Sequence, residues 1–260
     1  MGNEAVLWNM DPRGVATLTL NRPEVNNAYN EALVQGLHDA MDALGAHAGA
    51  RALLVRGAGR HFQAGADLNW IAQVASQSQQ ENERVSRATA LAVHRLNTLP
   101  LPAVALVQGG CFGGGTGIVA ACDIVIAAED AMFSIAETRW GLMAGIILPQ
   151  LADAIGARQV RRYALSGERF GAQEARRIGL VHEVVPSAEL NAAGERLLQQ
   201  LLQNAPEANE QTKAVALAFA WGAVDEASLG RLVVQHAAKR RSREAAEGLA
   251  SFREKRPARW

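Results

Sequence analysis

The segment Gly109–Ala127 (GGCFGGGTGIVAACDIVIA) decides the fold of this chain. The apolar run Ala103–Val107 leads into it as a strand, and six of the nine residues from 109 to 117 are glycine. A helix of small residues, Ile118–Cys122, and a strand, Asp123–Ala127, follow. Such a unit points free backbone N–H groups at a ligand above the helix N-terminus, and glycine permits the close approach. The ligand could be a phosphate or a carbonyl oxygen that gains negative charge.

Two other interpretations of this turn stay open on local grounds. Gly115–Ala120 matches the dinucleotide-binding pattern G-x-G-x-x-A, and Glu137 lies about 20 residues further on, where a ribose-binding acid is expected. That match is weak, because the turn lies in mid-chain and no alternating series of strands and helices follows it. The second alternative is close packing of a helix on a strand, which also needs small side chains.

A second turn of the same kind favours the carbonyl oxygen as the ligand. The buried strand Arg51–Arg56 ends before Arg60–Leu68 (RHFQAGADL), in which small residues precede an acid that begins a helix. The two turns lie about 48 residues apart. An oxyanion hole needs two such N–H donors that are fixed before the reaction. We therefore expect both turns to face one oxygen atom.

Glu137 is the candidate proton carrier. It lies in the rather apolar segment Ser134–Leu142. A desolvated carboxyl has a raised pKa and can exchange a proton near neutral pH. The alternatives are a salt bridge to Arg139 or a helix cap.

The composition excludes several classes of protein. The 260 residues carry 26 basic and 26 acidic side chains, so a nucleic-acid or anionic-membrane binder is not expected. Basic clusters occur only at 239–243 and 253–259, where they form either a solvated helix face or a phosphate site. Two cysteines give no disulfide framework or zinc spacing, and no metal motif or G-x-S-x-G motif occurs. The N-terminus lacks a signal-peptide pattern, and we expect a reduced, soluble, cytoplasmic protein.

Periodicity predicts the other elements. Val15–Leu20 reads as a strand, and Asn26 and Asn27 are expected to cap a helix that runs to about Leu44. The polar stretch 73–82 is expected to be a mobile loop or frayed helix. A β-β-α pattern recurs before about residue 130, and helices dominate after Pro149. Further expected elements are a helix over 84–98, a strand over 181–185, and helices over 204–220 and 223–250.

These features, in this order, resemble the crotonase (enoyl-CoA hydratase/isomerase) superfamily over nearly the whole chain. The other segments that carry the resemblance are Leu20–Ala28 (LNRPEVNNA), Ala121–Ile124, Phe133–Leu142, Leu165–Glu168, Ala175–Val181 and Glu247–Arg256. The resemblance implies an α/β fold, a spiral of ββα repeats. Residues 1–200 would form the core with the active site, and residues 201–260 a helical region that joins subunits into trimers or dimers of trimers.

The resemblance also implies roles for individual residues. The N–H groups of Ala66 and Gly114 would hold the thioester oxygen, and Glu137 would exchange a proton at the carbon alpha to the thioester. Coenzyme A would be part of the substrate, with no separate cofactor and no metal. The residues implied in binding it are Ala64, Asp67, Leu68 and Asn69 along its channel, and Arg22 and Lys255 near its phosphates.

One position departs from the two-glutamate hydratases of this family. The second glutamate would follow the glycine triplet by two residues, and here Gly117 stands there. Residues 112–127, 137–142 and 252–260 nevertheless resemble bacterial methylglutaconyl-CoA and isohexenylglutaconyl-CoA hydratases of leucine or acyclic-terpene breakdown. We expect a hydratase of branched, carboxylated enoyl-CoA thioesters, with Arg139 a conceivable partner for the carboxylate. The alternatives are a double-bond isomerase that uses Glu137 alone, and a non-catalytic CoA- or RNA-binding homologue.

Overall fold

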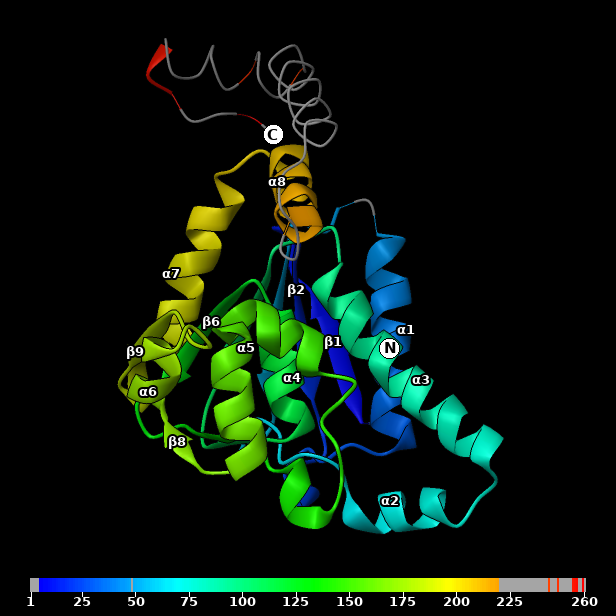
Figure 1. Cartoon of the computed structure of the whole chain (residues 1–260). Helices are drawn as coiled ribbons and strands as arrows, with labels where there is room; N and C mark the ends of the chain where they lie inside the picture. Colours follow the sequence, from blue (N-terminus) through cyan, green and yellow to red (C-terminus); the bar gives the residue numbers. More distant parts are fainter. Residues whose placement is uncertain are drawn as a thin grey trace.

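The fold is described from a computed structural model of the chain (Figure 1). The structure describes residues 5–47 and 49–219, together with residues 243, 247, 254–256 and 259. It is a mixed α/β fold, as the sequence predicts.

A six-stranded sheet forms the centre of the molecule. Its order is β1-β2-β3-β4-β6-β9, and all neighbouring pairs are parallel except β1 with β2. The strands are β1 (Val6–Met10), β2 (Val15–Leu20), β3 (Ala52–Gly57), β4 (Ala103–Val107), β6 (Ile124–Ala128) and β9 (Glu183–Val185). The predicted strands 15–20 and 103–107 are confirmed residue for residue, whereas β1 is not among the predicted strands.

A second, three-stranded sheet has the order β5-β7-β8. Its strands are β5 (Gly110–Phe112), β7 (Met132–Ser134) and β8 (Phe170–Gly171). The chain alternates between the two sheets, because β4 is followed by β5 and β6 is followed by β7. Each of these pairs is followed by a helix, α4 (Gly114–Ala121) or α5 (Leu148–Ser166), so the ββα unit is the repeat of the fold.

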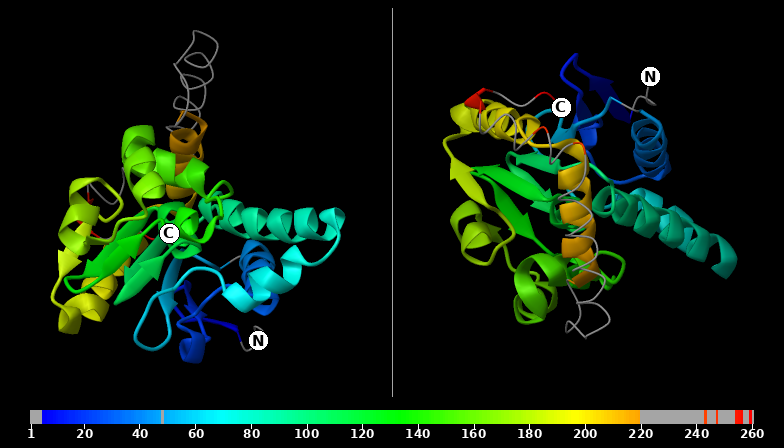
Figure 2. Two further views of the ribbon diagram at one scale, coloured as in Figure 1. Left: turned by 60° about the horizontal axis from the view of Figure 1, so that its bottom comes forward. Right: turned by 90° about the horizontal axis from the view of Figure 1, so that it is seen from above.

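Helices cover both faces of the central sheet. Successive residues of β4 point to opposite faces: Val104 and Leu106 pack with residues of α7 (Leu190–Leu202), and Ala105 belongs to the larger core on the other side. Figure 2 shows α3 projecting away from the sheets. The remaining helices are α1 (Glu31–Gly45), α2 (Leu68–Ala75), α3 (Gln79–Asn97), α6 (Ala172–Arg177) and α8 (Pro206–Phe219), with short 3₁₀ turns η1 (Pro23–Val25), η2 (Glu137–Trp140) and η3 (Ser187–Glu189).

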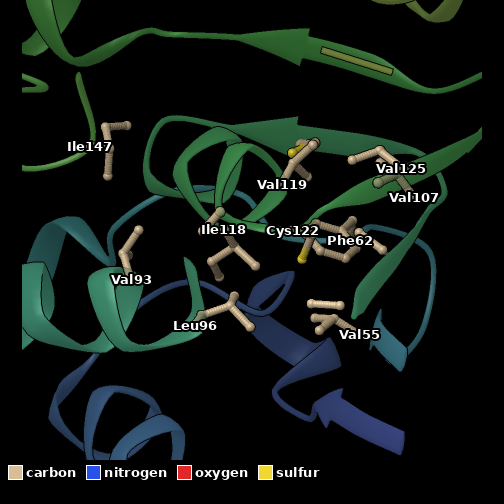
Figure 3. Packing of buried hydrophobic residues seen from close by; sticks show 14 of the residues in the cluster. Val55, Phe62, Val93, Leu96, Val107, Ile118, Val119, Cys122, Val125 and Ile147 are labelled. Carbon is tan, nitrogen blue, oxygen red and sulfur yellow. The ribbon is translucent and has the colours of Figure 1, made fainter. Parts of the chain in front are cut away.

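Helix α4 lies inside the larger core. Ile118 and Val119 are 0% exposed, and they pack with apolar residues of α3 and of both turns (Figure 3). Because the first turn of α4 carries the glycines, this packing fixes the N-terminus of α4 in place. The helix begins at Gly114, earlier than the predicted residue 118.

One prediction between the strands is wrong. Asn26 and Asn27 do not cap α1; both adopt left-handed backbone angles, and Asn30 caps the helix by accepting from the Leu33 N–H (2.9 Å). The side chain of Asn27 is instead buried and donates to three carbonyls of residues 58–62. The stretch 73–82, expected to be a mobile loop or frayed helix, is the end of α2 and the start of α3 with only residues 76–78 between them, so the helical alternative is the one found.

Helix α8 is the last helix whose two ends the structure describes. No residue of α8 is buried, and Lys213 joins it to the core by donating to Asp123 (2.8 Å) and to the carbonyl of Leu101 (3.0 Å). The expected boundary after residue 200 falls near the end of α7. The helix predicted over 223–250 lies outside the described residues except at 243 and 247, which are helical. None of the described helices is long and apolar enough to span a membrane.

Candidate active site

A cavity of about 790 Å³ lies where the two turns meet. Its described walls come from both turns, from α2 and α3, and from segments 134–147 and 167–169. Ala66, Gly114 and Glu137, the three residues predicted to carry the chemistry, all line it.

The two turns are in direct contact. A Cβ placed on Gly113 would lie 3.5 Å from the Cα of Gly65, so no side chain separates them. The backbone of Gln63 pairs with β5, since Gln63 donates to the Gly110 carbonyl (3.1 Å) and accepts from the Phe112 N–H (2.8 Å). Residues 48 positions apart thus build one wall, as the sequence predicts.

The N–H groups of Ala66 and Gly114 are available to a ligand. Ala66 and Tyr29 form a parallel β-bridge. In this bridge the Tyr29 N–H donates to the Gly65 carbonyl (2.8 Å), and the Asp67 N–H donates to the Tyr29 carbonyl (2.9 Å). The N–H of Ala66 therefore points away from Tyr29. Gly114 is the first residue of α4, and its N–H is one of the orphan donors of a helix N-terminus. Within the described residues neither N–H has a hydrogen-bond acceptor.

Two glycines of the triplet make room for neighbours. A Cβ on Gly114 would lie 2.6 Å from Cε2 of Tyr29, and a Cβ on Gly115 would lie 2.6 Å from Oε1 of Gln63. A side chain at Gly114 would displace the Tyr29 ring, and a side chain at Gly115 would push Gln63, and with it the second turn, away from the first.

Glu137 begins η2 and lies beside the turn that carries Gly113. A Cβ on Gly113 would lie 3.1 Å from its Oε1, and its Oε2 is buried without a hydrogen-bond partner among the described residues. Burial raises the pKa of the Glu137 carboxyl above its ordinary value. The alternative of an ion pair with Arg139 is not found in the described structure. Oε2 of Glu137 is therefore desolvated and available to a ligand in the cavity.

The position of the missing second glutamate is filled. A Cβ on Gly117 would lie 2.3 Å from Cγ2 and 2.7 Å from Cβ of Ile147, which is 3% exposed. Figure 3 shows Ile147 beside α4. Gly117 does not line the cavity, and no carboxylate fits there while Ile147 keeps its position.

The residues implied in CoA binding divide into two groups. Ala64 and Leu68 line the cavity. Asp67 caps α2 by accepting from the Asn69 N–H (3.0 Å), and it lies 3.7 Å from the guanidinium of Arg22. Arg22 also donates to the Ala28 carbonyl (2.6 Å), so it ties the first-strand motif to the second turn.

The last residue implied in CoA binding is Lys255. It is exposed, has a left-handed backbone, and is not among the described residues that line the cavity. Of the basic clusters, Arg256 pairs with Glu247 (2.6 Å), whereas residues 239–242 lie outside the described residues.

Sequence reasoning missed three residues of the site. Gln63 is 0% exposed and joins the turns, although it lies inside the predicted motif. Tyr29 lines the cavity two residues after Asn27, and its position against Gly114 has no sequence signal. Arg169 lines the cavity with its guanidinium 5.2 Å from the ring centre of Phe112, a contact that only the fold creates.

Known proteins share both the sequence and the fold. The chain is 32% identical over 250 residues to the 2,3-dehydroadipyl-CoA hydratase of Escherichia coli, covering 93% of each chain. It is 31% identical over 256 residues to the mitochondrial Delta(3,5)-Delta(2,4)-dienoyl-CoA isomerase of Dictyostelium discoideum, covering 95% of this chain and 87% of that protein. The crystal structure of an enoyl-CoA hydratase from Shewanella pealeana superposes with a TM-score of 0.94 at 32% identity, over 98% of this chain and 96% of that one.

The family model described as Enoyl-CoA hydratase/isomerase matches residues 11–260. The fold, the two contacting turns and the sequence relatives agree with it. The chain is therefore a member of the enoyl-CoA hydratase/isomerase family, the crotonase superfamily.

Proposed function

We propose that this enzyme adds water to the double bond of an α,β-unsaturated acyl-CoA thioester. The observation that carries the proposal is Oε2 of Glu137, which is buried and has no hydrogen-bond partner among the described residues, beside the turn that presents the Gly114 N–H. A carboxyl with a raised pKa next to two free N–H donors suits proton transfer to and from an enolate.

The proposed reaction runs through one enolate. The thioester oxygen accepts hydrogen bonds from the N–H groups of Ala66 and Gly114. Water attacks the β carbon while Glu137 accepts its proton, and the π electrons move to the thioester oxygen. The enolate then collapses, and the protonated Glu137 delivers its proton to the α carbon. Loss of one N–H donor typically costs about 3–4 kcal/mol of transition-state stabilisation.

Coenzyme A enters this scheme only as part of the substrate. Ala64 and Leu68 line the cavity beside Ala66 and would contact the pantetheine arm. Arg22 and Lys255 remain the proposed neighbours of the phosphates. Asp67 and Asn69 form the start of α2, where the Asp67 side chain caps the helix.

We further propose that the acyl group carries a carboxylate, as in branched glutaconyl-CoA thioesters. Arg139 and Arg169 line the cavity, and neither has a carboxylate partner in the part of the chain that is described. Two guanidinium groups without ion pairs suit a substrate anion, since charge-assisted hydrogen bonds are the strong ones. The name of the Escherichia coli relative, 2,3-dehydroadipyl-CoA hydratase, supports a carboxylated acyl chain.

Product analysis tests this proposal. The enzyme is incubated with crotonyl-CoA, 3-methylglutaconyl-CoA and a longer isoprenoid glutaconyl-CoA, and products are identified by mass spectrometry. We expect addition of water, with the highest kcat/KM on a glutaconyl thioester. Glu137→Gln should lower kcat by about 10²–10⁴-fold. Near-full hydration by Glu137→Gln would remove Glu137 from its role.

Double-bond isomerisation is the second candidate, and the contact between Gly117 and Ile147 favours it. An isomerase needs one base that removes a proton and returns it elsewhere, so Glu137 alone suffices. The Dictyostelium relative is an isomerase by name. A 3-enoyl-CoA substrate distinguishes the two reactions, because the isomerase yields the 2-enoyl isomer without a gain of water. A non-catalytic homologue would bind CoA thioesters and turn over none of them.

We propose self-association into trimers, single or paired. Trp140 (64% exposed) and Met143 (80% exposed) line the cavity, and such exposed apolar surface is typical of a contact region. Light scattering after gel filtration measures the assembly.

A further inference from the structure

Both proposed donors belong to peptide groups whose carbonyl accepts two hydrogen bonds. The N–H of Ala66 shares a peptide with the Gly65 carbonyl, which accepts from the Tyr29 N–H (2.8 Å) and from Nε2 of Gln63 (2.9 Å). The N–H of Gly114 shares a peptide with the Gly113 carbonyl. That carbonyl accepts from the N–H (2.9 Å) and the hydroxyl (2.7 Å) of Thr116.

This arrangement fixes the direction of each N–H. In a planar trans peptide the carbonyl and the N–H point in opposite directions, so donors that hold the carbonyl also aim the N–H. Hydrogen bonds to the carbonyl polarise the peptide and make its N–H a stronger donor. Each of the two peptides is held by one main-chain donor and one side-chain donor.

The two side chains are fixed by their surroundings. Gln63 and Thr116 are both 0% exposed, although both are polar. Oε1 of Gln63 also accepts from the Gly65 N–H (2.7 Å), so one side-chain amide holds both polar groups of Gly65. Gln63 lies against Gly115, where a Cβ would be 2.6 Å from its Oε1. Buried polar groups arranged in this way hold a single geometry.

We propose that Gln63 and Thr116 are positioning residues that aim and polarise the Ala66 and Gly114 N–H groups toward the thioester oxygen. The inference rests on the proposed function, since it concerns the same oxyanion. Negative charge on that oxygen grows only as the reaction proceeds, so loss of a side-chain donor lowers kcat and leaves KM nearly unchanged.

The test uses Thr116→Val and its matched control Thr116→Ser in the full-length protein. Valine keeps the shape and removes the hydroxyl, and the Gly113 carbonyl keeps the Thr116 N–H, so folding is preserved. Serine keeps the donor. Gln63→Met removes the other side-chain donor. The readouts are kcat and KM for crotonyl-CoA, and the absorption maximum of bound 4-dimethylaminocinnamoyl-CoA at saturation, which moves to the red when the thioester carbonyl is polarised.

We expect Thr116→Val and Gln63→Met to lower kcat about tenfold with KM changed less than about twofold, and to reduce the red shift. Thr116→Ser should restore both. A full red shift and full kcat in Thr116→Val, or no recovery in Thr116→Ser, would overturn the inference alone. A wild-type protein that binds the probe without any red shift would overturn the proposed function together with it.

Discussion

Ile147 occupies the space that a side chain at Gly117 would need, since a Cβ there would lie 2.3 Å from its Cγ2. The absence of a second glutamate is therefore part of the packing between α4 and the segment that precedes α5. A carboxylate at 117 would require Ile147 to move.

Gly117→Glu should destabilise the protein without adding hydration activity. Overpacking and a buried acid together cost at least about 3 kcal/mol, which lowers Tm by roughly 6–12 °C. The same substitution at Gly45, where a Cβ meets nothing within 4 Å, is the control and should change Tm little. In an Ile147→Ala background the cost of Gly117→Glu should shrink, as expected of residues in contact. Equal costs in both backgrounds, measured by calorimetry, would contradict the contact.

The pH dependence of kcat/KM should reflect the burial of Glu137. The proposed base must be ionised, and burial raises the pKa of its carboxyl, so activity should fall as the pH drops through a value above that of an ordinary glutamate. Initial rates with crotonyl-CoA across the acid range measure this limb. An acid limb at the ordinary glutamate pKa would mean that the carboxyl is solvated in the enzyme.

Glu137→Gln should raise Tm at pH 7–8. A group whose pKa is raised in the folded state contributes stability below its unfolded pKa, and this contribution is lost as the pH rises through the folded pKa. Glutamine does not ionise, so the variant does not lose this stability at high pH. The Tm gain of Glu137→Gln over wild type should therefore shrink as the pH approaches 4. A Tm difference that is constant with pH would exclude a raised pKa.

Arg139→Met and Arg169→Met should select against carboxylated substrates. Each would remove a charge-assisted hydrogen bond proposed to the substrate carboxylate, so KM for 3-methylglutaconyl-CoA should rise about 10–100-fold, while KM for crotonyl-CoA stays within about twofold. Arg161→Met is the control, because Arg161 is exposed and does not line the cavity. Parallel changes for both substrates would assign the arginines to CoA or to folding.

Lys213→Met should loosen α8 without unfolding the sheets. Lys213 is bonded to Asp123, and no residue of α8 is buried, so loss of the pair removes about 1–3 kcal/mol from the docking of this helix. Limited proteolysis should cut between α7 and α8 faster than in wild type, with Lys213→Arg closer to wild type. Unchanged cleavage would show that other contacts hold α8.

Strong local periodicity made much of the fold predictable. The strands 15–20 and 103–107 stand where the β-branched and apolar runs place them, and Leu33, Leu37 and Met41 all face the core from α1. Strand β1 was not predicted because it is a short edge strand whose exposed face carries Leu7 (44% exposed), so apolar and polar residues do not alternate along it. The prediction that Asn26 and Asn27 cap α1 was wrong because asparagine is favoured both at helix caps and in left-handed turns. Tertiary contacts decide between the two conformations.

The parts of the site that main-chain groups form could be predicted from the sequence. The two glycine- and alanine-rich turns and Glu137 come together because the ends of neighbouring strands meet. Side-chain relationships across the fold were not predictable. The contact of Ile147 with Gly117, the bonds of Gln63 to Gly65, and the position of Arg169 beside Phe112 depend on segments that are distant in sequence or on rotamers.

The main-chain hydrogen bonds that hold the two turns to each other and to neighbouring segments also determine how the site opens. The Tyr29 N–H donates to the Gly65 carbonyl, the Phe112 N–H to the Gln63 carbonyl, and the Gly113 N–H to the Ser134 carbonyl, and none of these bonds belongs to the six-stranded sheet. Opening one bond exposes its neighbours. In hydrogen–deuterium exchange these amides should become labelled together, as one cooperative unit with a single opening free energy. A single opening free energy would mean that the two proposed N–H donors are lost together and not one at a time.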